Sequence, residues 1–225
     1  MFMHLILKAI DFVLHVNLYL KGILSAYGAW TYALLFLIIF METGFVITPF
    51  LPGDSLIFAA GALAPAGALN VFVLYLIFAT AAIGGDNTNY WIGHAIGERA
   101  FTGEIKWIKK EYMDRAHAFF EKHGGMAIVL GRFVPIIRTF VPFVTGISEM
   151  PYGQSLRWDV TGGLVWVALF LAGGYTLGNN AWVQEHFSVV IVAIVLISVV
   201  PALVEGWKVR QEGKKVKPQT KAEIS

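Results

Sequence analysis

The chain has 225 residues, of which 57% are hydrophobic and 14% carry a charge, and its mean hydropathy is +0.66. Soluble domains have about a quarter of charged residues, so this composition argues against a soluble protein and indicates a polytopic membrane protein. The length accommodates one compact domain with about four to six membrane passes. Because cysteine is absent, disulfides and thiolate metal sites are excluded, and the redox compartment stays undetermined.

Residues 1–20 predict an amphipathic helix. Apolar side chains recur at helical spacing on one face, and His4, Lys8, Asp11 and His15 share the other. These polar residues interrupt any signal-peptide core, and no small-residue cleavage site follows them. Two placements remain open for this helix, on the membrane surface or packed against the helical bundle.

Residues 30–48 form the first predicted membrane span. Glu42 is its single charge, and it lies 12 residues past Trp30. That separation is roughly 18 Å along a helix, well inside a hydrocarbon layer about 30 Å thick. An unpaired carboxylate at that depth costs at least ~2.5 kcal/mol, so we expect Glu42 to be neutral, paired or in contact with water.

Residues 49–66 interrupt the helical pattern. Pro49 and Pro52 each remove a backbone donor, and the sequence Pro52-Gly53-Asp54 is typical of a tight turn with Asp54 capping the next helix. The apolar run that follows is too short to cross a membrane. This segment therefore predicts a re-entrant hairpin, whose irregular backbone must be buried in protein or line a wet cavity.

Residues 70–94 form the second predicted span. Asp86 and Tyr90 share one of its faces. Asp86 either belongs to a functional site or reaches the membrane interface near the end of the helix. Residues 98–123 then predict an amphipathic surface helix, and the six-residue spacing of His117 and His123 does not suit a metal site.

A second broken segment, residues 125–147, resembles the first with the opposite charge. Arg132, Pro135, Arg138 and Gly146 interrupt an otherwise apolar run. Two guanidinium groups at membrane depth require partners, so we expect them to meet the carboxylates of the first hairpin. Glu42, Asp54, Arg132 and Arg138 would then form one balanced polar site, with Pro52, Gly53, Asp86, Tyr90, Pro135 and Gly146 in support.

Residues 156–178 and 187–207 form the third and fourth predicted spans, followed by a disordered basic tail, residues 208–225. The third span is rich in glycine and either packs internally or mediates a homo-oligomer. Lys8, Lys21, Arg157 and most other basic residues fall on one predicted side, which places both termini in the cytoplasm. The predicted fold is all-α, with four transmembrane helices, surface amphipathic helices and two opposed re-entrant hairpins in an inverted repeat, as in many transporters.

Several motifs together resemble the DedA family of bacterial inner-membrane proteins, which carry the VTT domain. They are E-T-G with P-F-L-P-G-D-S-L, then D-N-T-N-Y-W-I-G, and finally F-F-E-K-H-G-G with G-R-F-V-P-I-I-R and P-F-V-T-G. The family's essential positions map to Glu42, Asp54, Arg132 and Arg138, while Thr145 departs from its usual alanine. The resemblance implies two re-entrant hairpins and a role in envelope integrity that depends on the proton motive force. Some bacterial members are implicated in returning undecaprenyl phosphate across the membrane, and distant eukaryotic members scramble phospholipids.

Three hypotheses follow for the function. The first is a lipid-phosphate translocase, in which both arginines bind phosphate and Glu42 or Asp54 carries a proton. The second is a proton-coupled antiporter of small cations, and the third is an assembly factor whose ion pairs only fix the fold. No catalytic triad, metal spacing or phosphate loop predicts an enzyme, a metal or a cofactor. The basic tail is better explained by membrane topology or anionic lipid than by nucleic acid.

Overall fold

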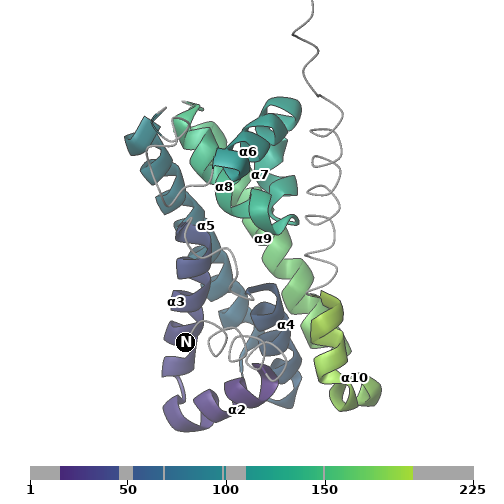
Figure 1. Ribbon diagram of the computed structural model, residues 1–225. Helices are drawn as coiled ribbons and strands as arrows, with labels where there is room; N and C mark the ends of the chain where they lie inside the picture. The colour runs from purple at the N-terminus through teal and green to yellow at the C-terminus, as the bar shows by residue number, and fades with distance from the viewer. Residues whose placement is uncertain are drawn as a thin grey trace, which may run out of the picture.

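The computed structural model describes residues 16–45, 53–67, 69–97, 99, 110–148 and 150–194. This part of the chain is helical and contains no strand. Residues 1–15 of the predicted N-terminal helix, Pro52 of the first hairpin and the tail 208–225 lie outside the described residues. The helices (Figure 1) are α2 Val16–Tyr27, α3 Trp30–Gly44, α4 Gly53–Leu63, the 3-10 turn η1 Ala64–Ala66, α5 Val71–Ile96, α6 Lys110–His123, α7 Met126–Gly131, α8 Pro135–Ile147, α9 Tyr152–Leu177 and α10 Ala181–Glu185, with residues 187–194 helical again.

Two long helices, α5 and α9, form the centre of the molecule. Each has 26 residues and is apolar and long enough to cross a membrane, and in the described residues they are the two helices that meet this test. They run antiparallel, because the rings of Trp91 and Tyr152 are 5.3 Å apart at one end and the hydroxyl of Tyr75 lies 3.4 Å from the carbonyl oxygen of Leu164 further along.

Helix α3 runs in the same direction as α5. The backbone N–H of Asn70, just before α5, donates to the hydroxyl of Tyr32 near the start of α3, and Gly44 at the end of α3 packs on the backbone of Gly85. We predicted residues 30–48 as a membrane span followed by a re-entrant hairpin over residues 49–66. The described helix has 15 residues, about 22 Å, and ends beside the middle of α5.

Helix α8 continues the line of α3 along the second half of α5. Gly93 of α5 packs on the backbone of Phe143, and Gly146 packs on the backbone of Tyr90 and His94. Glycine is required at these positions, because a Cβ atom would overlap the facing carbonyl oxygen. Thus α5 is flanked by two short parallel helices placed end to end.

Helix α9 is flanked in the same way by α7 and α4. Both run parallel to it, α7 beside its first half and α4 beside its second. The segment α3–α4–α5 therefore has a counterpart in α7–α8–α9 that runs in the opposite direction, and Figure 1 shows the short helices ending near the middle of the molecule. Close contacts define how the short helices align with α9. Gly125 lies beside Trp158 and Val129 beside Gly162 for α7, and Phe58 lies beside Gly174 and Ala62 beside Gly178 for α4.

We call the end that carries α2 and α10 the lower end, and the end that carries α6 and the start of α9 the upper end (Figure 1). Lys21 on α2 lies at the lower end, and Arg157 lies near the upper end. The prediction that these two residues share one side was wrong, because α3 enters from the same end as α5. Arg99, Arg115 and Lys122 still give the upper end the larger share of described basic side chains.

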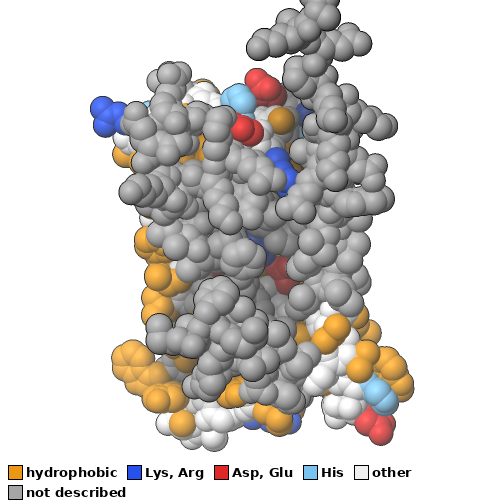
Figure 2. Space-filling view, viewed as in Figure 1, with side chains coloured by type: hydrophobic (Ala, Val, Ile, Leu, Met, Phe, Trp, Pro, Cys, Tyr) orange, Lys and Arg blue, Asp and Glu red, His pale blue; other side chains and the backbone are white. Residues whose placement is uncertain are grey.

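Exposed aromatic side chains mark two levels on the surface. Phe72 and Trp30 are 78% and 76% exposed near the lower end, and Trp91 is 50% exposed near the upper end. Nineteen residues of α5 separate Phe72 from Trp91, about 28 Å along the helix, close to the ~30 Å of a hydrocarbon layer. Figure 2 shows apolar side chains along one flank between these levels, which is typical of a membrane-facing surface.

Candidate functional site

Arg138 joins the two halves of the molecule. It lies in the first turn of α8, and its Nη1 donates to Asp54 Oδ1 at 2.8 Å, in the first turn of α4. Its Nη2 forms an ion pair with Glu42 in the last turn of α3. The backbone N–H of Gly53 also donates to Glu42 Oε1 at 3.3 Å. The tips of three short helices therefore meet on one guanidinium group.

Arg132 forms a second site with different partners. It follows the last residue of α7, and its Nη2 lies 2.5 Å from Asp86 Oδ2 on α5 and forms an ion pair with Asp159 on α9. The side chain of Arg132 is 1% exposed. Its Nε and Nη1 have no hydrogen-bond partner among the described residues. These two nitrogens are therefore buried donors whose hydrogen bonds are unsatisfied within the described part of the chain.

The predicted single cluster is thus divided into two. Glu42, Asp54 and Arg138 come together as expected, but Arg132 pairs with Asp86 and Asp159 instead of with the hairpin carboxylates. Sequence reasoning left open whether Asp86 reaches the interface; it is 2% exposed and part of an ion pair. Asp159 was missed, although a carboxylate inside the predicted span 156–178 was a signal that could have identified it.

Trp166 of α9 lies between the two arginines. The guanidinium carbon of Arg138 is 5.2 Å from the centre of its ring, and that of Arg132 is 6.0 Å away. The side chain is fully buried, and its Nε1 has no hydrogen-bond partner among the described residues. The aromatic ring thus provides cation–π contact to both sites, each worth ~0.5–2 kcal/mol.

The helix ends explain part of this pairing. Asp54 at the start of α4 and Arg132 after the end of α7 each carry the charge that the local helix dipole favours. Glu42 at the end of α3 and Arg138 at the start of α8 carry the opposite, unfavourable charge. These two residues are paired with each other, so each charge is stabilised by its partner although its own helix dipole disfavours it.

Carboxylates outnumber arginines in the two sites. Glu42, Asp54, Asp86 and Asp159 face Arg132 and Arg138, and five of these six side chains are less than 9% exposed, Asp54 being 16% exposed. Full ionisation would leave an excess of two negative charges in a low-dielectric interior, which is strongly unfavourable. The arrangement therefore favours the uptake of protons or cations.

Asn89 of α5 forms side-chain hydrogen bonds to both halves of the molecule. Its amide nitrogen donates to the carbonyl oxygen of Thr139 on α8 at 2.6 Å, and lies 3.5 Å from that of Thr43 on α3. The supporting residue Tyr90 faces the upper end instead, where its hydroxyl donates to the carbonyl oxygen of Met150 at 2.6 Å. Pro135 is the first residue of α8, where the missing N–H costs no hydrogen bond.

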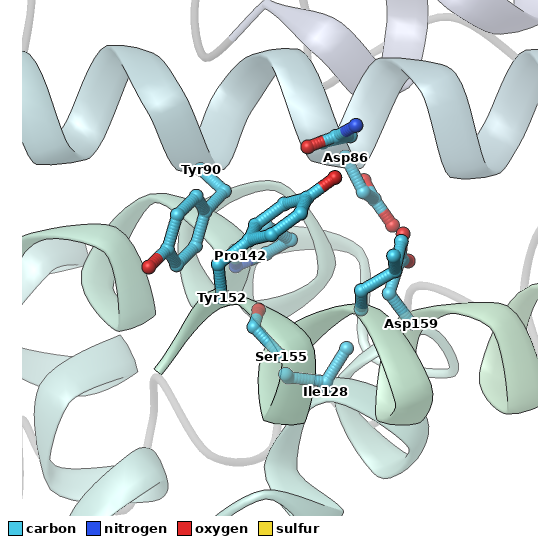
Figure 3. Close-up of a pocket in the computed structure, with 9 residues that line it drawn as sticks. Asp86, Tyr90, Ile128, Pro142, Tyr152, Ser155 and Asp159 are labelled. Carbon is cyan, nitrogen blue, oxygen red and sulfur yellow. The ribbon is translucent and has the colours of Figure 1, made fainter. Parts of the chain in front are cut away.

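A narrow cleft, with room for about one water molecule, lies beside the second site. Figure 3 shows the ring of Tyr152 extending across it with the hydroxyl toward Asp86, and Asp159 rising from the opposite side. Tyr90 and Ser155 also line it. Among the described residues, no group of three His, Cys, Asp or Glu side chains is arranged to hold a metal ion.

Comparison with known proteins identifies the family. The family model for the VTT domain matches residues 51–176. Protein DedA of Escherichia coli K12 is 47% identical over 206 residues, which cover 90% of this chain and 94% of the relative. The chain belongs to the DedA family.

Other DedA-family relatives are named as membrane proteins. An uncharacterized membrane protein of Mycobacterium tuberculosis H37Rv is 42% identical, over 85% of this chain and 86% of the relative. Inner membrane protein YghB of Escherichia coli K12 is 31% identical, over 75% and 77%. No solved structure matches the chain. The VTT-domain match includes Asp54, both buried arginines, Asp86 and Asp159, and Glu42 precedes it.

Proposed function

We propose that this DedA-family protein is a transporter driven by the proton motive force that moves a lipid phosphate, such as undecaprenyl phosphate or a phospholipid, and thereby supports envelope integrity. In this proposal the protein is a multi-pass protein of the bacterial inner membrane. The upper end, with most of the described basic side chains, faces the cytoplasm. The paired short helices α3 with α4 and α7 with α8 act as re-entrant hairpins whose tips meet within the membrane.

The observation that carries the proposal is the state of the two buried arginines. Arg132 has two nitrogen atoms, Nε and Nη1, without a hydrogen-bond partner among the described residues. A guanidinium group donates strong hydrogen bonds to phosphate oxygens and stays charged at any physiological pH, so these unsatisfied donors suit a phosphate group. Arg132 therefore supplies the first contact for a phosphate headgroup.

Arg138 binds phosphate in this proposal only after one of its carboxylate partners has taken up a proton. Both of its ion pairs are with carboxylates, Glu42 and Asp54, and these occupy the positions that phosphate oxygens would take. A proton bound by either carboxylate removes its charge and weakens its hold on the guanidinium group. Phosphate then replaces the carboxylate on Arg138, which couples headgroup binding to proton uptake. Each charge moved across the membrane supplies about 2.3 kcal/mol per 100 mV.

Reconstitution in liposomes tests this function. A fluorescent lipid phosphate is loaded in both leaflets, and its translocation is followed with and without an imposed proton gradient. We expect gradient-dependent translocation by the wild type and at least about a tenfold loss in Arg132→Ala and Arg138→Ala. The exposed Arg157→Ala is the matched control and should match the wild type. Equal rates in all four proteins would refute the proposal.

A proton-coupled antiporter of small cations is the second candidate. The excess of carboxylates over arginines in the two sites favours it, because a cation would neutralise that charge. Competition separates the two candidates. If the cargo is a small cation, that cation should inhibit proton flux in the liposomes and added lipid phosphate should not, whereas the lipid-phosphate proposal predicts the reverse.

A purely structural role is the third candidate, since buried ion pairs also occur without transport. The charge exchange Asp54→Arg with Arg138→Asp distinguishes it. These two residues are direct partners, whereas Asp54 and Arg132 are not. Full activity in the exchanged protein would support pairing alone, because the phosphate-binding guanidinium group would then sit on the wrong helix.

A further inference from the structure

The second site differs from the first in having two carboxyl groups that reach each other. Asp86 and Asp159 project from the antiparallel helices α5 and α9, and both bind Nη2 of Arg132. Because both carboxylates bind the same nitrogen atom, the two carboxyl groups lie side by side. Figure 3 shows the two side chains extending toward each other from the two helices. Two ionised carboxylates cannot hydrogen-bond, because both are acceptors only.

A further polar group at this site lacks a partner. Asp86 is 2% exposed, and its Oδ1 has no hydrogen-bond partner among the described residues. A buried carboxylate oxygen without a donor is costly, and a bound proton removes that cost. The unsatisfied oxygen and the placement of two carboxylates on one nitrogen atom are separate observations, and one proton explains both.

The charges around Asp86 and Asp159 also call for one bound proton. Arg132 neutralises one carboxylate, and Arg138 is already paired with Glu42 and Asp54. Apart from the two carboxyl groups, the titratable groups that line the cleft are the hydroxyls of Tyr90 and Tyr152, and the described lining contains no cationic side chain. One negative charge therefore remains on the pair, and one proton balances it.

We propose that Asp86 and Asp159 form a proton-binding pair that takes up a single shared proton from the upper end through the cleft beside Tyr152. A hydronium ion in the cleft gives its proton to one carboxylate oxygen and leaves as water. The protonated carboxyl group donates to the other carboxylate, which stays ionised and paired with Arg132. The inference rests on the proposed function and adds to it a second protonation site beside Glu42 and Asp54.

Infrared difference spectroscopy of the full chain in phospholipid vesicles tests the pair. We expect the wild type at neutral pH to show a carboxylic-acid C=O band that is absent from both Asp86→Asn and Asp159→Asn. The double variant should lose no more of the band than either single variant, because one proton serves both groups. Glu121→Gln, which replaces a 69% exposed carboxylate on α6, is the control and should keep the full band.

Two results would overturn the inference. One is a spectrum in which the wild type and both single variants have the same carboxylic-acid signal. The other is loss of the band when sodium chloride replaces choline chloride, which would identify a metal cation as the occupant. The lipid-phosphate proposal is judged separately, because gradient-driven translocation in a protein without the band would leave the transport function standing and refute only the pair.

Hydrogen–deuterium exchange in heavy water tests the route by which the proton reaches Asp86 and Asp159. Ser155 lines the cleft and is 5% exposed, so Ser155→Leu should narrow the passage while Ser155→Ala leaves it open. The isotope shift of the shared carboxyl band measures how fast its proton exchanges. We expect exchange at least several-fold slower in the leucine variant than in the alanine variant. Equal rates would show that the proton arrives by another path.

Discussion

Arg138 and Glu42 lie at the tips of two helices from opposite halves of the molecule, and the guanidinium group of the first binds the carboxylate of the second. Each residue carries the charge that its own helix end disfavours. Their contact therefore stabilises the meeting point of α3 and α8 only while both remain charged. Protonation of Glu42 removes that stabilisation, which makes this junction the point where proton binding can change the structure.

Replacing Arg138 by lysine tests the value of the guanidinium fork. Arg138 uses two different nitrogens for Glu42 and Asp54, whereas an ammonium group offers a single point charge. We expect Arg138→Lys to lower lipid-phosphate translocation at least about tenfold and to be less destabilising than Arg138→Ala, since removing one partner of a buried pair costs about 3–5 kcal/mol. Translocation in liposomes and thermal unfolding in detergent measure both effects. Wild-type rates in the lysine variant would show that charge alone is sufficient.

Asn89 is expected to contribute through its hydrogen bonds rather than its volume. Its amide group reaches carbonyl oxygens on α8 and α3. Asn89→Ala leaves the buried carbonyl oxygen of Thr139 without this donor, at a cost of about 1–3 kcal/mol. Thr88→Ala is the control, because the hydroxyl of Thr88 bonds only to the carbonyl of Gly84 in its own helix. Chemical denaturation should show the larger loss for Asn89→Ala, and equal losses would contradict its bridging role.

Glycine positions on α5 give a test of helix packing. A Cβ atom at Gly93 would overlap the carbonyl oxygen of Phe143 on α8, so Gly93→Ala must push the helices apart. We expect a loss of about 1–3 kcal/mol in unfolding free energy. At Gly84 the nearest atom to an added Cβ is Phe40 Cε2 at 3.5 Å, an ordinary contact. Gly84→Ala should therefore be neutral or slightly stabilising, since alanine favours helix.

The sequence was sufficient to predict the helical membrane class, the two breaks and the residues of the first site. Charged residues inside apolar runs are costly, so Glu42, Arg132 and Arg138 stood out without any structure. The partners of Arg132 were not predictable in this way. They depend on α5 and α9 crossing so that Asp86 and Asp159 meet, and that crossing is set by contacts between distant segments.

The direction of α3 was the other feature that sequence patterns did not give. A mostly apolar helix of 15 residues before a break suits either a short span or the first arm of a hairpin. The choice is made by packing, because Gly44 and Gly85 let the backbones of α3 and α5 approach closely when the helices are parallel. The count of basic residues at each end then changes, since Lys21 moves to the end opposite Arg157.

Trp166 offers a test of the link between the two arginine sites. Its ring faces both guanidinium groups, at 5.2 Å for Arg138 and 6.0 Å for Arg132. Trp166→Phe keeps an aromatic face, whereas Trp166→Leu keeps only apolar volume. Because an aromatic ring stabilises a nearby cation by ~0.5–2 kcal/mol, the leucine variant should release both arginines from their present positions more easily.

The expected result is a larger loss of translocation in Trp166→Leu than in Trp166→Phe, measured in the same liposome assay at equal protein density. Both variants leave a cavity in the core, so their thermal unfolding must be compared as well. If the two variants lose stability equally but differ in transport, the aromatic face acts on the arginines. If they transport lipid phosphate at the same rate, the ring serves only to fill the space between α9 and the hairpin tips.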